Sequence, residues 1–476
     1  MGLEGNLLFR NGLPVKENDN RWSTLRSCVM QSSNSYEPSM ESNVRSYCRL
    51  FPVVFESAVG STLRDAAGRE YLDFFCGAGS LNYGHNNRHV KQALINYISA
   101  DGIQHSLDTA TSAKLRFIEA FKTRILDPRG YDYRIQFTGP TGTNAVEAAV
   151  KLARMQTQRS HVVAFTNAYH GHTLGALSLT GNQYYHSEFY GSHNNVSHLP
   201  FDGYMDNLDT SHLLEKMLCD RSSGLPIPAA VILETVQGEG GINIASSEWL
   251  RRIETICKRF DIRLIVDDIQ VGNGRTGEFF SFEKSGIVPD MVCLSKSIGG
   301  GLPMAIVLVR PQFDQGKPGE HTGTFRGNNL AFVAASALLE NYWTESSFEE
   351  SIHEKSSQIE SYAKAIAQRS VCNALRIRGR GLIWGIDVAS GKIASAVIRN
   401  CFEQGLLIEA CGVDDSVLKI MPALTISQSQ IALGMSMLER AISQAFAAES
   451  TPGNVVCEAA AGLFLTQFGS PGVVEC

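Results

Sequence analysis

The sequence predicts an α/β protein in which a mostly parallel central sheet carries helices on both faces and a smaller α+β domain follows. Short β-branched segments alternate with helical patterns through the middle of the chain, which is typical of a parallel sheet. After about Asn328 this alternation gives way to long amphipathic helices with short strand-like pieces between them. The chain has 476 residues, about three times the roughly 150 residues expected per domain.

Several segments of the middle region have the composition of buried strands, with turn residues at their ends. They are Arg134–Phe137, Val162–Phe165, Ala229–Leu233, Arg263–Asp267, Met291–Leu294 and Ala305–Val309. Continuous apolar runs of this kind indicate parallel strands that are covered on both faces. We therefore expect these segments to form the central sheet.

The C-terminal part has a different pattern. Amphipathic helices are predicted over Leu330–Trp343, Phe348–Gln368 and Ser427–Ala447, with strand-like pieces at Leu382–Asp387 and Leu418–Met421. We expect five regions in all. They are a loose leader over 1–38, a β-rich N-terminal segment over 39–88 that packs with the small domain, a large domain over 89–328, the small domain over 329–448, and a tail over 449–476 of unassigned role.

Composition excludes several classes of protein. Hydrophobic residues make up 43% and charged residues 19% of the chain, so it is not a disordered protein. The net charge of −6 provides no positive field for nucleic acid or for an anionic membrane surface. We find no apolar run of membrane-spanning length and no secretory signal pattern. The expectation is a cytoplasmic protein with no nucleic-acid or membrane partner.

The 11 cysteines are scattered and form no C-x-x-C pair. This fits neither a disulfide framework nor a zinc site, so no metal is expected. Cys293 lies within an apolar strand-like run, and we interpret it as a small buried side chain rather than a nucleophile. Glycine is abundant, with 43 residues, and many of the glycines fall at the ends of predicted strands.

The first segment with chemical character contains Lys296, which follows the strand-like run Met291–Leu294 and precedes Gly299–Gly301. Open α/β sheets bind ligands at the carboxyl ends of their strands. A half-buried amine at that place has a depressed pKa and can form a Schiff base. Taken alone, an ordinary surface lysine remains the alternative.

The second segment ends the strand Arg263–Asp267 with the carboxylates Asp267 and Asp268, and Gln270 follows. A carboxylate at a strand end can keep a heterocyclic nitrogen protonated. Capping or turn formation is the alternative for each aspartate. Gly272–Gly277 matches the G-x-G-x-x-G dinucleotide pattern, but no clear helix follows it, so we discount that reading.

A third segment, Thr141-Gly142-Thr143, lies between a strand and a strong helix. Unpaired backbone N–H groups and the helix dipole favour a phosphate there. Thr324 stands among glycines in a later segment and is also suited to a phosphate oxygen. Plain helix capping is the alternative for the first of these segments, but it explains one residue and not the whole run.

Aromatic and acidic side chains follow two further strands. Tyr169 and His170 come shortly after Phe165, and Tyr169 is suited to stacking on a flat cofactor ring. Metal binding by His170 and His172 is disfavoured, because these residues are two positions apart and lack a nearby acidic partner. After Ala229–Leu233 come Glu234 and, five residues later, Glu239.

In this order, the six segments resemble the class III pyridoxal-phosphate-dependent aminotransferases of fold type I, from about Glu41 to Ala447. The resemblance implies pyridoxal 5'-phosphate as cofactor, small amino-acid and oxo-acid substrates, and a homodimer or higher homo-oligomer. It also implies that Lys296 binds the cofactor covalently and that Asp267 pairs with the pyridinium nitrogen. The remaining cofactor-binding residues implied by the match are Thr141, Gly142, Thr143, Tyr169, His170, Glu234, Gln270 and, for the neighbouring subunit's phosphate, Thr324.

Within this class, the sequence most resembles the diaminobutyrate–2-oxoglutarate branch, known from ectoine and siderophore pathways. The residues that carry the likeness are 41–52, 74–87 and 138–144. Departures from the common class pattern are Asn144 for Glu, Thr235 for Pro, Asp268 for Glu and Lys419 for Arg, and these also favour the branch. The implied reaction converts L-glutamate and L-aspartate 4-semialdehyde to 2-oxoglutarate and L-2,4-diaminobutyrate.

Substrate carboxylates need cationic partners, and the candidates are Arg45, Lys419 and Arg326. In the family a glutamate, here Glu239, covers the residue at position 419 for one substrate and releases it for the other. Alternatives are a class III enzyme that uses 4-aminobutyrate or ornithine as amino donor, an intramolecular aminomutase, and a non-catalytic binding protein of the same fold.

Overall fold

The computed structural model describes residues 40–190, 195–206, 208–369 and 375–449. The predicted leader over 1–38 and the tail beyond residue 449 lie outside the described residues. The chain divides into two compact units, of which the smaller contains residues up to Ser57 and Leu63–Glu70, and the larger contains Ala58–Thr62 and the chain from Tyr71 onward. Each unit is considered by itself.

The smaller unit contains helix α2 (Tyr47–Leu50) and most of strands β1 (Phe55–Val59) and β2 (Thr62–Asp65). The chain turns directly after β2. Asp65 Oδ1 accepts hydrogen bonds from the backbone N–H groups of Ala67 at 3.0 Å and Arg69 at 2.9 Å. Gly68 has a φ of +84°, a conformation that favours glycine. The chain therefore turns through Gly68.

The larger unit is built on a seven-stranded sheet with the strand order β4-β12-β11-β10-β7-β5-β6. The strands are β4 (Arg134–Phe137), β5 (Val162–Phe165), β6 (Val196–Leu199), β7 (Ala230–Leu233), β10 (Arg263–Asp267), β11 (Met291–Leu294) and β12 (Ile306–Val309). Strand β12 runs in the opposite direction to the other six strands, which all run in the same direction. All the predicted strands are confirmed, and β7 and β12 each begin one residue later than predicted.

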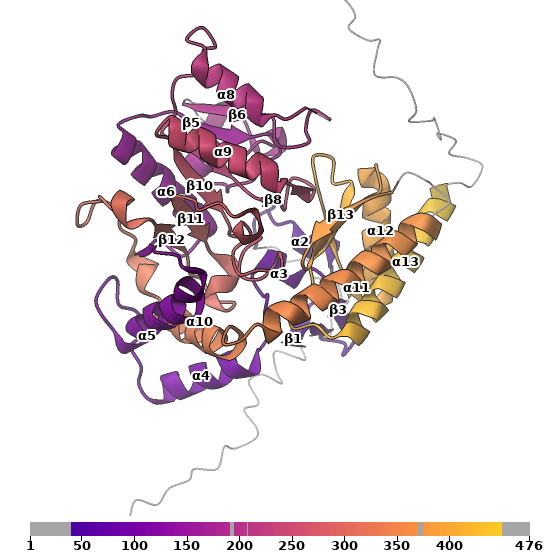
Figure 1. Ribbon diagram of the computed structural model, residues 1–476. Coiled ribbons are helices and arrows are strands. Elements are labelled where there is room, and N and C mark those ends of the chain that lie inside the picture. Colours follow the sequence, from indigo (N-terminus) through magenta and orange to yellow (C-terminus); the bar gives the residue numbers. More distant parts are fainter. Residues whose placement is uncertain (1–39, 191–194, 207, 370–374, 450–476) are drawn as a thin grey trace, which may run out of the picture. The chain divides into compact units, whose positions relative to one another are not determined.

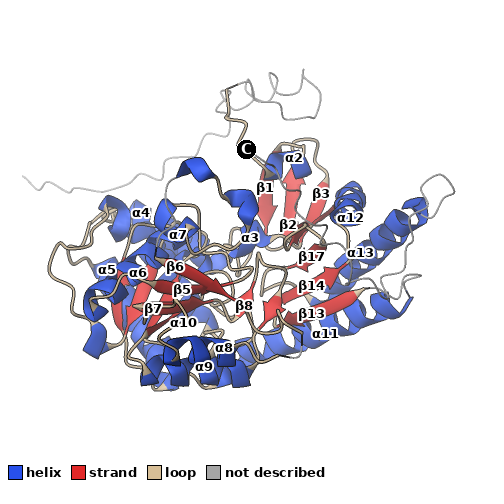
Figure 2. Ribbon diagram, turned by 90° about the horizontal axis from the view of Figure 1, so that it is seen from above, coloured by secondary structure: helices blue, strands red, loops and turns tan. Residues whose placement is uncertain are grey.

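Helices cover both faces of this sheet, as predicted (Figure 2). Alternate residues of the strands point to opposite faces, and two separate apolar clusters result. Helix α6 (Gly142–Thr157) packs on one face, while α5 (Ser112–Phe121), α8 (Ser211–Cys219), α9 (Ser247–Arg259) and α10 (Asn329–Tyr342) contribute to the cluster on the other. Three further helices of the larger unit precede or follow these: α3 (Cys76–Gly79), α4 (Arg88–Ser99) and α7 (Leu174–Leu177).

The C-terminal part of the larger unit has its own apolar cluster. It contains an antiparallel sheet with the order β13-β14-β17-β16, and helices α11, α12 and α13 lie close to one another beside it (Figure 1). The bounds are β13 (Arg376–Arg380), β14 (Ile383–Asp387), β16 (Glu409–Cys411), β17 (Val417–Ile420), α11 (Ser347–Arg369), α12 (Gly391–Gln404) and α13 (Gln428–Glu449). Strand β15 (Leu406–Leu407) pairs in parallel with β3 (Glu70–Asp73) through Leu72 and Asp73.

Some elements were not predicted. Strand β6 has only β5 as a neighbour and contains Ser197 and His198, so its sequence lacks the apolar run of a central strand. The short pair β8 (Val236–Gln237) and β9 (Asn243–Ile244) was also missed.

Helix α10, which was predicted as part of the small domain, packs Phe332 into an apolar cluster of the seven-stranded sheet. The boundaries of the proposed domains stay a prediction.

No helix in the described part of the chain combines the length and the apolar character that a bilayer span requires.

The packing of α13 generates a stability prediction. A Cβ added at Gly434 would overlap the ring of the fully buried Phe74. Alanine normally stabilises a helix relative to glycine by about 1 kcal/mol, but overpacking costs about 1–3 kcal/mol. We expect Gly434→Ala to lower the thermal midpoint of unfolding. Gly316→Ala is the control, because no atom lies within 4 Å of that Cβ. A Gly434→Ala protein at least as stable as the native one would contradict the observed packing.

Candidate active site

The predicted chemical groups converge at one edge of the seven-stranded sheet. Strands β4, β5, β7, β10 and β11 all run in the same direction, so their carboxyl ends lie along this edge. A cavity of about 290 Å³ opens there. Its lining residues are Gly142, Thr143, Tyr169, His170, Gly171, His172, Glu234, Glu239, Asp267, Ile269, Gln270, Val271 and Lys296.

Lys296 follows β11 and has a φ of +52°, which is unusual for any residue except glycine. Its flanking serines are both anchored, because Ser295 Oγ donates to Met304 O at 2.9 Å and Ser297 Oγ donates to Gly79 O at 2.6 Å. Burial lowers the pKa of the Lys296 amine. Nζ makes no hydrogen bond or ion pair with any described residue. It is therefore a reactive type of amine that faces an open cavity.

Asp267 ends β10, beside Cys293 of β11 in the register of the sheet. Its Oδ2 lies 2.7 Å from His170 Nδ1, and both side chains are buried. Its Oδ1 accepts a hydrogen bond from the Ile269 backbone N–H at 3.2 Å. His170 Nε2 is buried without a hydrogen-bond partner. The sequence predicted both residues at the site but not their pairing.

Carboxyl groups on both sides of Asp267 have raised pKa values. Burial, and then the charge of Asp267, raises the pKa of Glu234 well above its ordinary value. Burial raises the pKa of Asp268 to about 7. Glu234 Oε2 accepts a hydrogen bond from the Tyr169 backbone N–H at 3.1 Å. Protonation of Glu234 and Asp268 reduces the negative charge that surrounds Asp267.

The beginning of α6 borders the cavity with Gly142 and Thr143. The first N–H groups of a helix have no partner within the helix and favour anions. A Cβ at Gly142 would stand 3.0 Å from the Ile269 side chain, so glycine allows this close approach. Thr143 Oγ1 lies 2.6 Å from Thr173 Oγ1. Gly142 and Thr143, two of the three residues predicted here to bind a phosphate, thus line the cavity.

Aromatic rings form another wall of the cavity. Tyr169 lines it, and its ring lies 5.4 Å from the ring of His172 and 5.9 Å from that of Tyr185, both edge to face. His172 and Tyr185 are 4.7 Å apart. Tyr185 was not predicted, because it comes from a short 3-10 segment without a motif (Gln183–Tyr185).

Charged and amide groups close the cavity beyond Lys296. Glu239 Oε1 accepts hydrogen bonds from Gln270 Nε2 at 2.9 Å and Lys419 Nζ at 2.8 Å. Burial opposes ionisation of Glu239, but Lys419 and Lys296 lower its pKa to about 2. Lys419 is buried and also pairs with Glu409 at 2.9 Å. Glu409 was missed, since it lies in a short strand with no recognisable motif.

Other predicted residues lie outside this cavity. Thr141 and Thr324 are exposed, and neither lines the cavity of the single chain. Arg326 pairs with Asp108 at 2.5 Å, at a different cavity of about 360 Å³. Arg45 belongs to the smaller unit, where it is 3.8 Å from Glu41. The roles of these four residues stay predictions.

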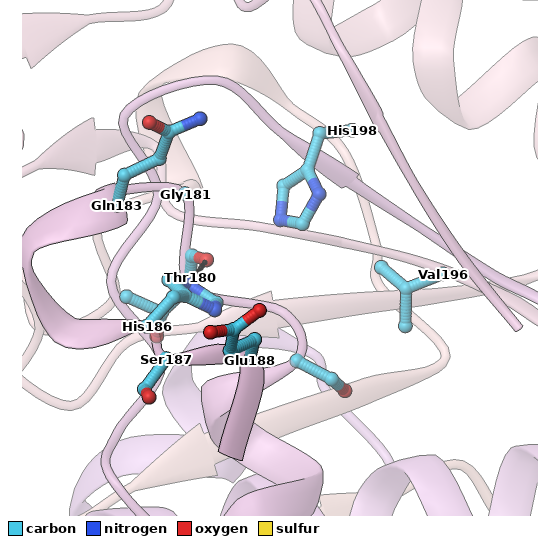
Figure 3. Close-up of a pocket in the computed structure, with 9 residues that line it drawn as sticks. Thr180, Gly181, Gln183, His186, Ser187, Glu188, Val196 and His198 are labelled. Carbon is cyan, nitrogen blue, oxygen red and sulfur yellow. Dashed lines mark hydrogen bonds between the residues drawn. The ribbon is translucent and has the colours of Figure 1, made fainter. Parts of the chain in front are cut away.

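A larger cavity of about 530 Å³ lies elsewhere in the larger unit. Figure 3 shows His198 and Val196 across an opening from Gln183 and His186. The ring Nε2 atoms of His186 and His198 lie 2.8 Å and 3.2 Å from the carbonyl oxygens of Thr180 and Leu179. None of the predicted site residues lines this cavity. The volume of a cavity therefore does not identify the candidate site in this protein. The chemical groups that line the cavity do identify it.

Two further sequence interpretations can be compared with the structure. Cys293 is fully buried in β11, and burial raises its pKa well above the ordinary value, so it is an inert core thiol as predicted. Residues 269–282 form turns, with no α-helix after the glycines. The helix that a dinucleotide fingerprint requires is absent from this described stretch, in agreement with our rejection of that reading.

The groups around the cavity suit pyridoxal 5'-phosphate. An amine of lowered pKa, a buried carboxylate and a helix N-terminus match its aldehyde, its ring nitrogen and its phosphate. In addition, Gln270 Oε1 is buried without a hydrogen-bond partner and belongs to a lining residue. The residues present therefore fit this cofactor.

Fold and site together define a class of protein. The model of the class III aminotransferase family matches residues 44–442. This chain therefore belongs to the class III aminotransferases, and the predicted family membership is confirmed.

Individual relatives agree with this assignment. A diaminobutyrate–2-oxoglutarate transaminase of Wolinella succinogenes is 54% identical over 406 residues, which cover 85% of this chain and 95% of the relative. One of Streptomyces coelicolor is 50% identical over 420 residues, which cover 87% of this chain and 99% of the relative.

Solved structures share the fold. A transaminase from the marine bacterium Virgibacillus matches with a TM-score of 0.76 at 19% identity, covering 89% of this chain and 99% of that one. The ornithine aminotransferase of Toxoplasma gondii matches with a TM-score of 0.73 at 23% identity, covering 91% and 99%. At these identities the likeness shows the fold alone, and it confirms the predicted fold type I.

Asp268 gives a pH-dependent prediction. Its folded pKa of about 7 lies above the ordinary value of 3.8, so stability falls as the pH rises between these values. Asn resembles the neutral acid and can still accept the hydrogen bond from the Ser281 N–H. We expect Asp268→Asn to gain stability over the native protein by up to about 1.4 kcal/mol per pH unit between about pH 5 and 7, with no further gain above.

Thermal midpoints at pH 5, 6, 7 and 8 measure this effect. Glu188→Gln removes an exposed carboxylate and serves as the control, for which no pH-dependent difference is expected. A difference between Asp268→Asn and the native protein that stays constant with pH would show that Asp268 does not titrate in this range.

Proposed function

We propose that the cavity binds pyridoxal 5'-phosphate and that the chain transfers amino groups between small amino acids and oxo acids. The observation that carries the proposal is the placement of Lys296 and of the Asp267–His170 pair at the ends of the adjacent strands β11 and β10. A surface lysine or a capping aspartate would not require this juxtaposition in a cavity.

The cofactor supplies an aldehyde that takes up amino groups and a ring that delocalises the charge left on the substrate carbon. Lys296 Nζ would hold the cofactor and would move the proton at the reacting carbon of the substrate. The lowered pKa of this amine suits both roles, because a neutral amine accepts a proton. Asp267, oriented by His170, keeps the ring nitrogen protonated.

The other lining residues position the cofactor. The N–H groups of Gly142 and Thr143 would bind its phosphate, and Tyr169 would pack against its ring. Gln270 would hold the ring hydroxyl, from which its unpaired Oε1 would accept a hydrogen bond. In a homodimer, Thr324 would reach the phosphate of the neighbouring subunit, which agrees with its exposure in the single chain.

We propose L-glutamate and L-aspartate 4-semialdehyde as substrates, giving 2-oxoglutarate and L-2,4-diaminobutyrate in a reversible reaction. Support comes from relatives at 50–54% identity over most of the chain that carry the name diaminobutyrate–2-oxoglutarate transaminase. Lys419 is the candidate cation for the substrate carboxylate, because it pairs with Glu239, which lines the cavity, although Lys419 itself does not line it. We propose a cytoplasmic location for this reaction.

Lys296→Ala tests the catalytic proposal. Loss of the amine should reduce turnover by at least about 10³-fold and remove the absorbance band of the lysine-bound cofactor. The matched control is Lys284→Ala, which removes an exposed lysine and should leave turnover and absorbance unchanged. Substantial turnover by the Lys296→Ala protein would require a different catalytic amine.

The substrate proposal is tested by adding single amines to the cofactor-loaded protein. L-2,4-diaminobutyrate and L-glutamate should each convert the bound cofactor to its amine form within one turnover, whereas 4-aminobutyrate and ornithine should react at least about tenfold more slowly. Absorbance spectra report the conversion. Preferred conversion by 4-aminobutyrate or ornithine would place the chain in another branch of the class, and products formed without 2-oxoglutarate would indicate an aminomutase.

A further inference from the structure

Lys419 lies between two carboxylates in the interior of the protein. Its Nζ is 2.8 Å from Glu239 Oε1 and 2.9 Å from Glu409 Oε1, and its side chain is fully buried. Glu409 is its direct cross-strand neighbour in the β16–β17 register. A buried lysine needs one counter-ion. The second carboxylate therefore requires a separate explanation.

The two carboxylates have different surroundings. Glu239 lines the cavity, and 26% of its side chain is exposed. Glu409 does not line the cavity, and only 5% of its side chain is exposed. A ligand that enters the cavity can displace Glu239 from Lys419. Glu409 lacks this freedom, because its side chain is buried and does not line the cavity.

The charges of this group depend on Glu409. Burial opposes the charge of Lys419, but Glu239 and Glu409 raise its pKa well above the ordinary value, so it is a cation. Glu239, with a pKa of about 2, is an anion. Burial raises the pKa of Glu409 to about 7, against the opposing influence of Lys419. Protonation of Glu409 makes the three residues neutral together, and its ionisation leaves one negative charge.

The environment of Glu409 contains few other ionisable groups. Among its charged neighbours, Lys419 and Glu239 act on its pKa most strongly, and Lys296 acts more weakly. The thiol of Cys411 lies on the same strand and interacts with the same group. Helix α12, which packs against β16, buries only the apolar or weakly polar residues Ala394, Val397, Ile398 and Cys401.

We propose that Glu409 is a positioning residue whose protonation decides whether Lys419 can hold the distal carboxylate of a dicarboxylic substrate. The proposal rests on the proposed function, in which glutamate and 2-oxoglutarate enter this cavity. When a substrate carboxylate displaces Glu239, protonated Glu409 leaves the charge of Lys419 available to the substrate. Ionised Glu409 neutralises Lys419 and repels the incoming carboxylate.

The expected signature is a pH dependence limited to ligands with a second carboxylate. If only the form with protonated Glu409 binds, a pKa of about 7 weakens dicarboxylate binding about tenfold between pH 6 and 8. A monocarboxylate of similar size does not reach Lys419, so its affinity should not follow this ionisation.

The test uses glutarate and butyrate, which bind without reacting, on the cofactor-loaded native protein and on Glu409→Gln. Native protein should bind glutarate about tenfold more weakly at pH 8 than at pH 6, relative to butyrate. The Glu409→Gln protein should bind glutarate equally tightly at pH 6 and pH 8, and about tenfold more tightly than the native protein at pH 8. Glu283→Gln removes another partly buried carboxyl of raised pKa, paired with Arg129, and should keep the native dependence.

A second measurement needs no variant. Calorimetry at pH 7.5 in buffers of different ionisation enthalpy should show proton uptake on binding of glutarate and none on binding of butyrate. An unchanged pH dependence in Glu409→Gln, or glutarate binding without proton uptake, overturns the role of Glu409. The proposed function fails separately, if glutamate and diaminobutyrate do not convert the cofactor.

Discussion

The site depends on one geometric constraint, which is that parallel strands end at the same edge of a sheet. Asp267 is the last residue of its strand, Glu234 directly follows its strand, and Lys296 lies two residues beyond its strand. Those three strands are hydrogen-bonded neighbours. Segments more than 100 residues apart, such as the start of α6 and the Lys296 loop, meet at this edge for the same reason. The loops supply the chemical groups of the site, and the apolar strands fix the positions of these loops.

This constraint explains how much could be predicted from the sequence. The central strands are buried on both faces, so their apolar runs identified them almost residue by residue. Because such strands are parallel, the loops that follow them lie along one edge of the sheet, and several of the predicted site residues in these loops line the same cavity. Edge strand β6 was not predicted, because it is only partly buried and its sequence combines apolar with polar residues.

Contacts that depend on side-chain reach could not be predicted in this way. Tyr185 approaches the cavity from a short segment with no motif. Glu409 meets Lys419 across a strand pair of the C-terminal sheet, whose register follows from packing rather than from periodicity. Thr141 and Thr324 were predicted from their small-residue turns and from the family resemblance, and a single chain does not bring them to the cavity wall.

The backbone of Lys296 has a further consequence. A left-handed conformation at a residue with a side chain costs about 1–2 kcal/mol, and glycine would remove this cost. Burial of the amine adds to the cost. At this position the fold would be more stable without the lysine, so selection for stability and selection for chemistry act in opposite directions. Loss of this lysine during evolution would therefore remove the activity and raise the free energy of unfolding. A chain that retains the lysine accepts a lower free energy of unfolding in exchange for its chemistry.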